Sequence, residues 1–197
     1  MKPILVLLTV AALIPRAAPA AEFRVRPGGE SKVVFVSTAA MERFEGKTNR
    51  LEGSIVVDST ALGDSVTVHF EVDVSSLDTG LAMRNRHMRE NHLETGRFPR
   101  AVFDGATLLD SSGVVLNPGV QTAFEAEGLF TLHGVSRRLR VRVEATYRAT
   151  AEDRRIAFRA TFLVALADYQ ISRPQFLFLK LAESQDVRVS GVAVASP

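Results

Sequence analysis

The chain has no cysteine and no tryptophan among its 197 residues. Without cysteine it can form neither a disulfide framework nor a lipid-modified cysteine behind a leader segment. A zinc site would need three of the four histidines to converge, or histidines together with carboxylates. The sequence also lacks a Gly-x-Ser-x-Gly elbow, a phosphate-binding glycine loop and a dinucleotide fingerprint. We therefore expect no metal site, no cofactor and no catalytic residue.

Long apolar runs are missing after the first twenty residues. The run from Ile4 to Ile14 follows Lys2 and precedes Ala18-Pro19-Ala20, which is typical of a secretory signal peptide cleaved after Ala20. This run is shorter than the roughly 20 residues of a membrane-spanning helix, and no later segment qualifies. We predict a signal peptide over residues 1–20, no integral membrane segment, and a periplasmic or secreted mature protein.

An excess of charge is also missing from the mature chain. Removing Lys2 and Arg16 with the signal peptide leaves 22 basic residues against 22 acidic ones, so the formal charge is zero. Because nucleic-acid binding depends on a basic surface, no nucleic-acid partner is expected. The remaining residues, 21–197, suit one domain. The sequence leaves the oligomeric state open, a homodimer included.

What the chain does have is repeated alternation of apolar and polar residues. Turn residues separate these segments and long helical periodicity is absent, so we predict an all-β fold. The expected strands span 23–26, 32–37, 51–58, 65–74, 101–109, 122–132, 138–148, 155–166 and 186–194. A long one-faced antiparallel sheet must close on itself or pack on a second sheet, and we favour a barrel over a sandwich. In the last strand, Val187 and Val189 change parity relative to Val192 and Val194, which predicts a β-bulge at Gly191.

A polar segment interrupts this pattern around residues 84–94. Met83, His87 and Asn91 are spaced for one face of a short helix, and Phe98-Pro99 ends it before the next strand. The strand that precedes the helix runs from Val66 to Val74 with clean alternation. A strand, a short helix and another strand together predict the mouth of a cavity near one end of the barrel.

Several short motifs in this order resemble those of the YceI-like family. They are Glu45-Gly46-Lys47-Thr48, Leu51-Glu52-Gly53, Thr79, Arg86-His87-Met88, Leu93-Glu94-Thr95, Phe98-Pro99, Phe103, Phe130-Thr-Leu-His-Gly-Val135 and Asp168-Tyr169-Gln-Ile171. The resemblance covers nearly all of the chain after residue 22. It implies an exported, lipocalin-like antiparallel barrel of about eight strands that binds a long isoprenoid or another lipid chain.

A barrel of this size is either filled by its own side chains or wide enough for one small ligand. Each interior phenylalanine is by itself ordinary core, and only the resemblance favours a ligand-binding role. The candidate ligand-binding residues of the interior and mouth are Phe35, Phe70, Met83, Arg86, His87, Met88, Phe103, Phe130, Phe158, Phe162, Phe176 and Phe178. The expected partner is a polyisoprenoid, an isoprenoid quinone or a fatty-acid derivative.

Other interpretations stay open at this point. The protein could be an envelope or stress-response protein with a filled barrel, or an enzyme that acts on a bound lipid through His87 or Glu90. The arginines near the mouth could bind an anionic head group or form a solvated helix face paired with Glu90 and Glu94. We expect His69 to point outward, His133 to brace a turn, and the apolar stretch after Pro174 to be a strand of the core or the mouth.

Overall fold

The structure, a computed structural model, describes residues 21–38, 43–57, 61–62, 65–109, 114–150, 153–176 and 179–196. Its main strands are β1 (Ala21–Val25), β2 (Lys32–Thr38), β3 (Arg43–Thr48), β4 (Leu51–Val57), β6 (Ser65–Asp73), β7 (Arg100–Leu108), β9 (Gln121–Leu132), β10 (Val135–Ala149), β11 (Arg154–Ala165) and β14 (Ser184–Ala195). Four two-residue strands form two small ladders: β5 (Ala61–Leu62) with β8 (Val114–Val115), and β12 (Gln175–Phe176) with β13 (Leu179–Lys180).

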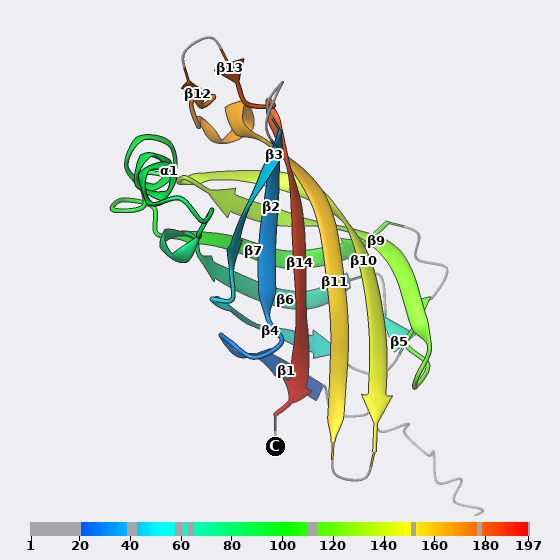
Figure 1. Cartoon of the computed structure of the whole chain (residues 1–197). Coiled ribbons are helices and arrows are strands. Elements are labelled where there is room, and N and C mark those ends of the chain that lie inside the picture. The colour runs from blue at the N-terminus through cyan, green and yellow to red at the C-terminus, as the bar shows by residue number, and fades with distance from the viewer. Residues whose placement is uncertain are drawn as a thin grey trace, which may run out of the picture.

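The main strands close into an antiparallel barrel (Figure 1). Neighbours follow the order β1-β4-β6-β7-β9-β10-β11-β14, and β14 pairs back with β1 through Phe23 and Ala195. The hairpin of β2 and β3 continues from the other half of β14, where Val187 lies opposite Phe35. The prediction of an antiparallel barrel of about eight strands with a short helix near one end is confirmed, and the sandwich alternative is excluded.

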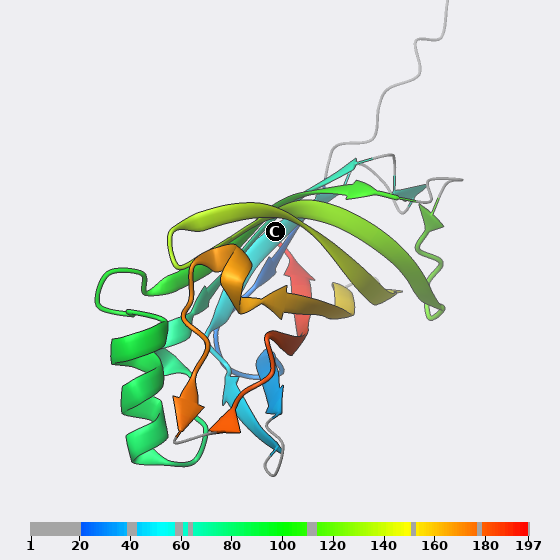
Figure 2. The ribbon, with the colours of Figure 1, turned by 90° about the horizontal axis from the view of Figure 1, so that it is seen from above.

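The helical elements gather at one end of this barrel. The 3₁₀ turn η1 (Val74–Ser76) leads to α1 (Ala82–His87), which continues directly into the π-helical turn η2 (Met88–His92). A third short turn, η3 (Leu166–Tyr169), follows β11. Both views show α1 and the β12–β13 hairpin at the end of the barrel away from the C-terminus (Figure 1, Figure 2). None of the helices in the described ranges has the length and apolar character needed to cross a bilayer.

The alternation of the sequence produces the two faces of the wall. In β10 and β11, Val141, Ala145 and Ile156 point inward and are buried. On the outside, Glu127 of β9 is within 3.4 Å of Arg138 and of Arg140 on the neighbouring strand. His69 also points outward, as predicted, with Nδ1 2.6 Å from Asp104 Oδ1.

One local prediction was wrong. The ladder between β11 and β14 runs without a shift from Ala165 opposite Ser184 to Arg155 opposite Val194, so there is no β-bulge at Gly191. Val192 and Val194 point outward instead, while Gly191 and Ala193 continue the inward face. Register shifts occur in β6 and β7, between Val66 and His69 and between Asp104 and Thr107.

The sequence also did not single out β3 as a strand. Its residues Arg-Phe-Glu-Gly-Lys-Thr contain a single large apolar side chain, Phe44, so no alternation is visible. The other inward positions of β3, on the same face as Phe44, are Gly46 and Thr48, which a hydrophobic pattern does not detect.

Candidate functional site

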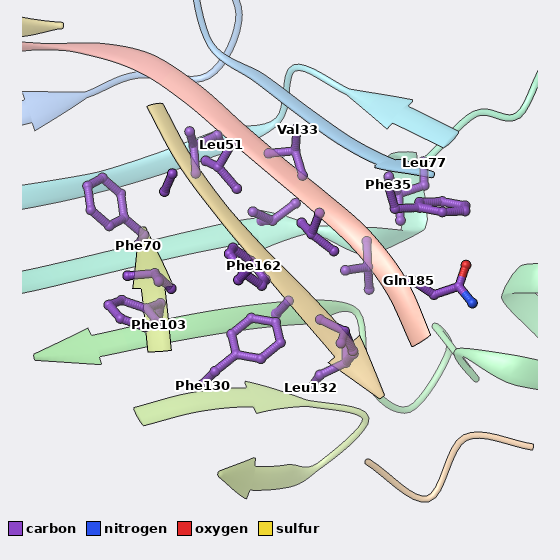
Figure 3. A pocket seen from close by; sticks show the side chains of 18 of the residues that line it. Val33, Phe35, Leu51, Phe70, Leu77, Phe103, Phe130, Leu132, Phe162 and Gln185 are labelled. Atoms are coloured by element: carbon purple, nitrogen blue, oxygen red, sulfur yellow. The ribbon is translucent and has the colours of Figure 1, made fainter. Parts of the chain in front are cut away.

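The barrel interior holds a cavity of about 890 Å³. This volume lies in the range of roughly 300–1,000 Å³ typical of small-molecule sites. Its wall is formed almost entirely by apolar side chains from β2, β4, β6, β7, β9, β10, β11 and β14 (Figure 3). The interior is therefore not filled by its own side chains, although six phenylalanines from the predicted set point into it.

Glycines on the neighbouring strands make room for four of these rings. Phe35 lies opposite Gly46, Phe70 opposite Gly53, and Phe158 opposite Gly191, and Phe103 lies against Gly128. A Cβ atom at Gly46 would overlap the ring of Phe35, and one at Gly53 would lie 2.6 Å from Phe70 Cδ1. At Gly191 the added Cβ would lie 3.1 Å from the ring of Phe158.

Placing each ring over a glycine keeps it against the wall and out of the centre of the barrel. Pairing an aromatic ring with a glycine on the adjacent strand also covers backbone that the glycine leaves exposed. This arrangement explains how an interior rich in phenylalanine still encloses a cavity. The contact with Phe158 also explains why residue 191 is a glycine, at the position where the sequence had suggested a β-bulge.

The end of the barrel opposite α1 is closed by packing. Phe23 of β1 and Tyr147 of β10 meet edge to face, with ring centroids 6.2 Å apart. Both side chains are buried, at 2% and 8% exposure, and they pack with Leu51 and Ala193 in one core cluster. Among the described residues, the exposed part of the cavity lining lies at the other end, at Leu81 and Met83.

At that other end, a hydrogen-bond network ties α1 to the loop after η1. The amide and hydroxyl of Thr79 both donate to Asn85 Oδ1, at 2.8 and 2.7 Å. Asn85 Nδ2 in turn donates to Asp78 Oδ1 at 2.7 Å, and this bond, together with that from the Gly80 amide, lowers the pKa of Asp78. Arg84 donates to the hydroxyl and the carbonyl of Thr79, and its guanidinium lies 3.9 Å from the centre of the Phe44 ring.

The far end of the helical segment is tied to two other parts of the chain. His92 Nδ1 lies 3.1 Å from the carbonyl oxygen of Ser172, and burial lowers the pKa of His92. His133 donates from Nδ1 to the carbonyl of Tyr169, and its Nε2 lies 3.4 Å from Glu94 Oε1. His133 therefore braces the turn between β9 and β10 against η3 and the helical segment, as the sequence suggested.

Few polar groups face the cavity away from this rim. Ser37 of β2 and Gln185 of β14 line it, and they are 1% and 7% exposed. Gln185 Nε2 donates to the carbonyl of Ala182 at 2.9 Å. Ser37 Oγ has no hydrogen-bond partner among the residues that the structure describes.

The structure brings together nine of the twelve predicted ligand-binding residues. The cavity is lined by Phe35, Phe70, Met83, His87, Met88, Phe103, Phe130, Phe158 and Phe162. Arg86 is exposed on α1 and is not part of this lining. The backbone of Phe176 lies in β12, and Phe178 lies outside the described residues.

Other lining residues were not identified from the sequence. Leu81 and Phe44 lie at the mouth, and Ser37 and Gln185 lie on the wall beside it. Ser37 shows a weak signal, because it continues the inward parity of Val33 and Phe35, but nothing in the sequence places Gln185 beside it. Within the described ranges, no three histidine, aspartate or glutamate side chains are grouped closely enough to hold a metal ion.

Comparison with known proteins adds a family match. The family model described as a YceI-like domain matches residues 23–195. A UPF0312 protein of Vibrio parahaemolyticus is 28% identical over 171 residues, covering 83% of this chain and 85% of that protein. A UPF0312 protein of a Shewanella species is 28% identical over 174 residues, covering 84% of each chain.

Solved structures share the fold at lower identity. A polyisoprenoid binding domain from Saccharophagus degradans superposes with a TM-score of 0.65 at 18% identity, covering 92% of this chain and 100% of that domain. BcnA of Burkholderia cenocepacia gives a TM-score of 0.63 at 16% identity, covering 82% and 95% of the two chains. At such identities the likeness concerns the fold.

Proposed function

The chain belongs to the YceI-like domain family, and on that premise we propose that it is an exported protein that holds a long apolar ligand inside its barrel. In this proposal the protein acts as a carrier or a sequestering protein in the periplasm or outside the cell. The segment proposed as a signal peptide, residues 1–20, lies outside the described residues. The observation that carries the proposal is the apolar cavity of about 890 Å³, open at the α1 end and closed by Phe23 and Tyr147 at the other.

The energetics favour such a ligand. At roughly 30 Å³ per chain carbon, similar to the share of one molecule in liquid water, the cavity would hold on the order of 30 carbons. Each buried methylene contributes about 0.8 kcal/mol, so a dozen give on the order of 10 kcal/mol. Association and ordering cost several kcal/mol of this, which leaves micromolar or tighter binding. One methylene more or less changes affinity by only about 1 kcal/mol, so length selection is weak.

One structural neighbour supports the same class of ligand. It is a polyisoprenoid binding domain from Saccharophagus degradans, and this chain has a similar barrel. A polyisoprenoid, an isoprenoid quinone or a fatty-acid derivative would each fit an apolar lumen with a narrow polar rim. The cavity also argues against the alternative of a filled barrel with an envelope or stress-response role.

The test is to purify the exported full chain gently and to analyse it by native mass spectrometry and organic extraction. We expect a long-chain lipid that leaves when the complex is activated in the gas phase. The matched control is Ala160→Phe, because Ala160 lines the cavity and a ring there occupies the ligand volume. Retention of no lipid by the wild-type protein, together with failure to bind an added long-chain probe, would contradict the proposal.

The same preparation tests the enzymatic alternative. His87 lines the mouth, whereas Glu90 is exposed and outside the lining. The carrier proposal expects the extracted lipid to be chemically unchanged after incubation, in the wild-type protein and in His87→Ala alike. Conversion of the lipid by the wild-type protein only would favour an enzyme.

A further inference from the structure

Besides the polar groups of the rim, two polar side chains on the strands, Ser37 and Gln185, interrupt the apolar wall of the cavity. Gln185 lies beside Phe35 and Leu77 at this end of the lumen (Figure 3). The β2–β14 ladder ends with Val36 opposite Asp186, and the next antiparallel step places Ser37 opposite Gln185 on the inward face. Directly opposed side chains of one face lie about 5 Å apart at Cβ. Ser37 and Gln185 therefore form one small polar patch.

The hydrogen bond from Gln185 to Ala182 determines which atom of the Gln185 amide can bind a ligand. A carbonyl oxygen only accepts, so the amide atom that faces Ala182 O at 2.9 Å is the NH₂ group. This anchor orients the amide and leaves Oε1 as the acceptor, to which no described residue donates. A ligand group that meets Oε1 must donate a hydrogen bond.

Ser37 contributes a hydroxyl that lacks a partner. It is 1% exposed, and its Oγ makes no hydrogen bond to any described residue. A buried hydroxyl without a partner costs stability, and most buried polar groups in folded proteins are paired. Rotation about the Cα–Cβ bond can bring Oγ to a ligand oxygen in the lumen, where the hydroxyl donates. The missing partner is accounted for if a ligand supplies it.

Charge near the patch argues against an anionic head group. Ser37 and Gln185 are neutral, and a desolvated anion needs a charged partner. Among the described residues that line this end, the arginine is Arg84, and its Nε and Nη2 groups already donate to Thr79 while its plane covers Phe44. A carboxylate or diphosphate would have to break these contacts.

Resting on the proposed function, we infer that Ser37 and Gln185 bind one neutral hydroxyl group at the head of the ligand. The hydroxyl donates to Gln185 Oε1 and accepts from Ser37 Oγ, so the preferred ligands are long-chain alcohols. The tail contributes most of the affinity, and the patch selects the head group.

The experiment compares three probes with the same tail: geranylgeraniol, its methyl ether and its diphosphate. Their affinities for the delipidated full chain are measured by displacement of a fluorescent fatty acid. The methyl ether keeps an oxygen that accepts from Ser37 but has no hydrogen to donate to Gln185 Oε1. The loss of this one neutral hydrogen bond predicts that the alcohol binds about tenfold more tightly than the ether. We expect the diphosphate to bind more weakly than the alcohol.

Variants of Ser37 and Gln185 test whether these two side chains bind the hydroxyl head group. In Gln185→Met the ratio between alcohol and ether should fall to a few-fold or less, while the ether binds as before. Ser37→Ala removes a donor that both probes use, so it should weaken the alcohol and the ether alike and leave their ratio unchanged. Ser190→Ala is the matched control, because Ser190 alternates with the inward Val189 and Gly191 on the same strand and should keep the ratio. Without ligand, Ser37→Ala should have a melting temperature equal to or above that of the wild type, because it removes an unpaired buried group.

The outcomes separate this inference from the proposed function. Equal binding of the three probes, strongest binding of the diphosphate, an unchanged ratio in Gln185→Met, or unchanged binding of both neutral probes in Ser37→Ala would overturn the inference and leave the carrier role standing. Failure of all three probes to bind would overturn the carrier role and the inference with it. Loss of the ratio in Gln185→Met with retained ether binding, together with equal weakening of both neutral probes in Ser37→Ala, supports both.

Discussion

The two ends of the barrel are built in opposite ways. At the closed end, Phe23 and Ala193 are at most 2% exposed and belong to one continuous core cluster. At the open end, Leu81 and Met83 are 55% and 60% exposed although they line the same cavity. The difference separates two tasks: the closed end supplies packing that holds the fold, and the open end leaves apolar surface available to a ligand.

The largest expected effect follows from opening the closed end. Phe23→Ala removes a buried ring and leaves a void, which should lower the free energy of unfolding by about 3–5 kcal/mol. Met83→Ala removes a side chain of similar apolar character at the open end, and its effect on stability should stay within about 0.5 kcal/mol. Urea denaturation of the two delipidated variants measures the contrast. Similar losses in both would show that the two ends do not differ in this way.

A smaller effect is expected from the wall near the open end. In Gly46→Ala the new Cβ overlaps the ring of Phe35 and pushes it toward the lumen, which costs about 1–3 kcal/mol and reduces the ligand volume. Gly191 lies nearer the closed end, and a Cβ atom added there is 3.1 Å from the ring of Phe158. Gly191→Ala should therefore cost less stability and less ligand volume than Gly46→Ala.

Denaturation and probe displacement measure both glycine variants. The double variant Gly46→Ala with Phe35→Leu should recover binding, because the smaller side chain removes the overlap. Additive effects of the two substitutions would contradict a direct contact.

The smallest expected effect is on the pH dependence of stability, through His92 at the open end. Burial lowers the pKa of His92, so the unfolded chain binds this proton more readily than the folded protein. The corresponding stability is complete above pH 6.5, the ordinary pKa of the group, and is lost as the pH falls through the folded pKa. His92→Gln should flatten this acid-side loss in denaturation curves taken between pH 7.5 and pH 5.

His69 on the outer wall serves as the control with the opposite sign. Its hydrogen bond to Asp104 raises the pKa of His69, so its contribution is present below pH 6.5 and is lost as the pH rises through the folded pKa. His69→Gln should therefore steepen the acid-side loss. A steeper loss in His92→Gln would contradict the role given to burial at the mouth.

The sequence predicted what depends on the chain's own periodicity. Alternation along Leu139 to Ala145 and Ile156 to Val164 gave the inner face correctly, and the polar segment with Met83 and His87 gave the short helix at one end. It also placed nine of twelve candidate residues on the cavity. These features are local, because each can be inferred from a side chain and its near neighbours.

The sequence did not predict what depends on register between strands. The role of Gly191 was misjudged because its partner, Phe158, is known only once β11 and β14 are paired. The patch of Ser37 and Gln185 was missed for the same reason, since it joins the ends of two strands that are far apart in the chain. Arg86 was included because helical spacing alone did not decide on which side of α1 it lies.

Two of the four ring–glycine pairs make the width of the barrel adjustable at separate places. At Gly46 and Gly191 an added Cβ meets side-chain atoms, so a substitution at either pair changes the lumen locally. At Gly53 and Gly128 an added Cβ would also overlap a backbone carbonyl oxygen of the neighbouring strand, so the strand ladder itself requires glycine there.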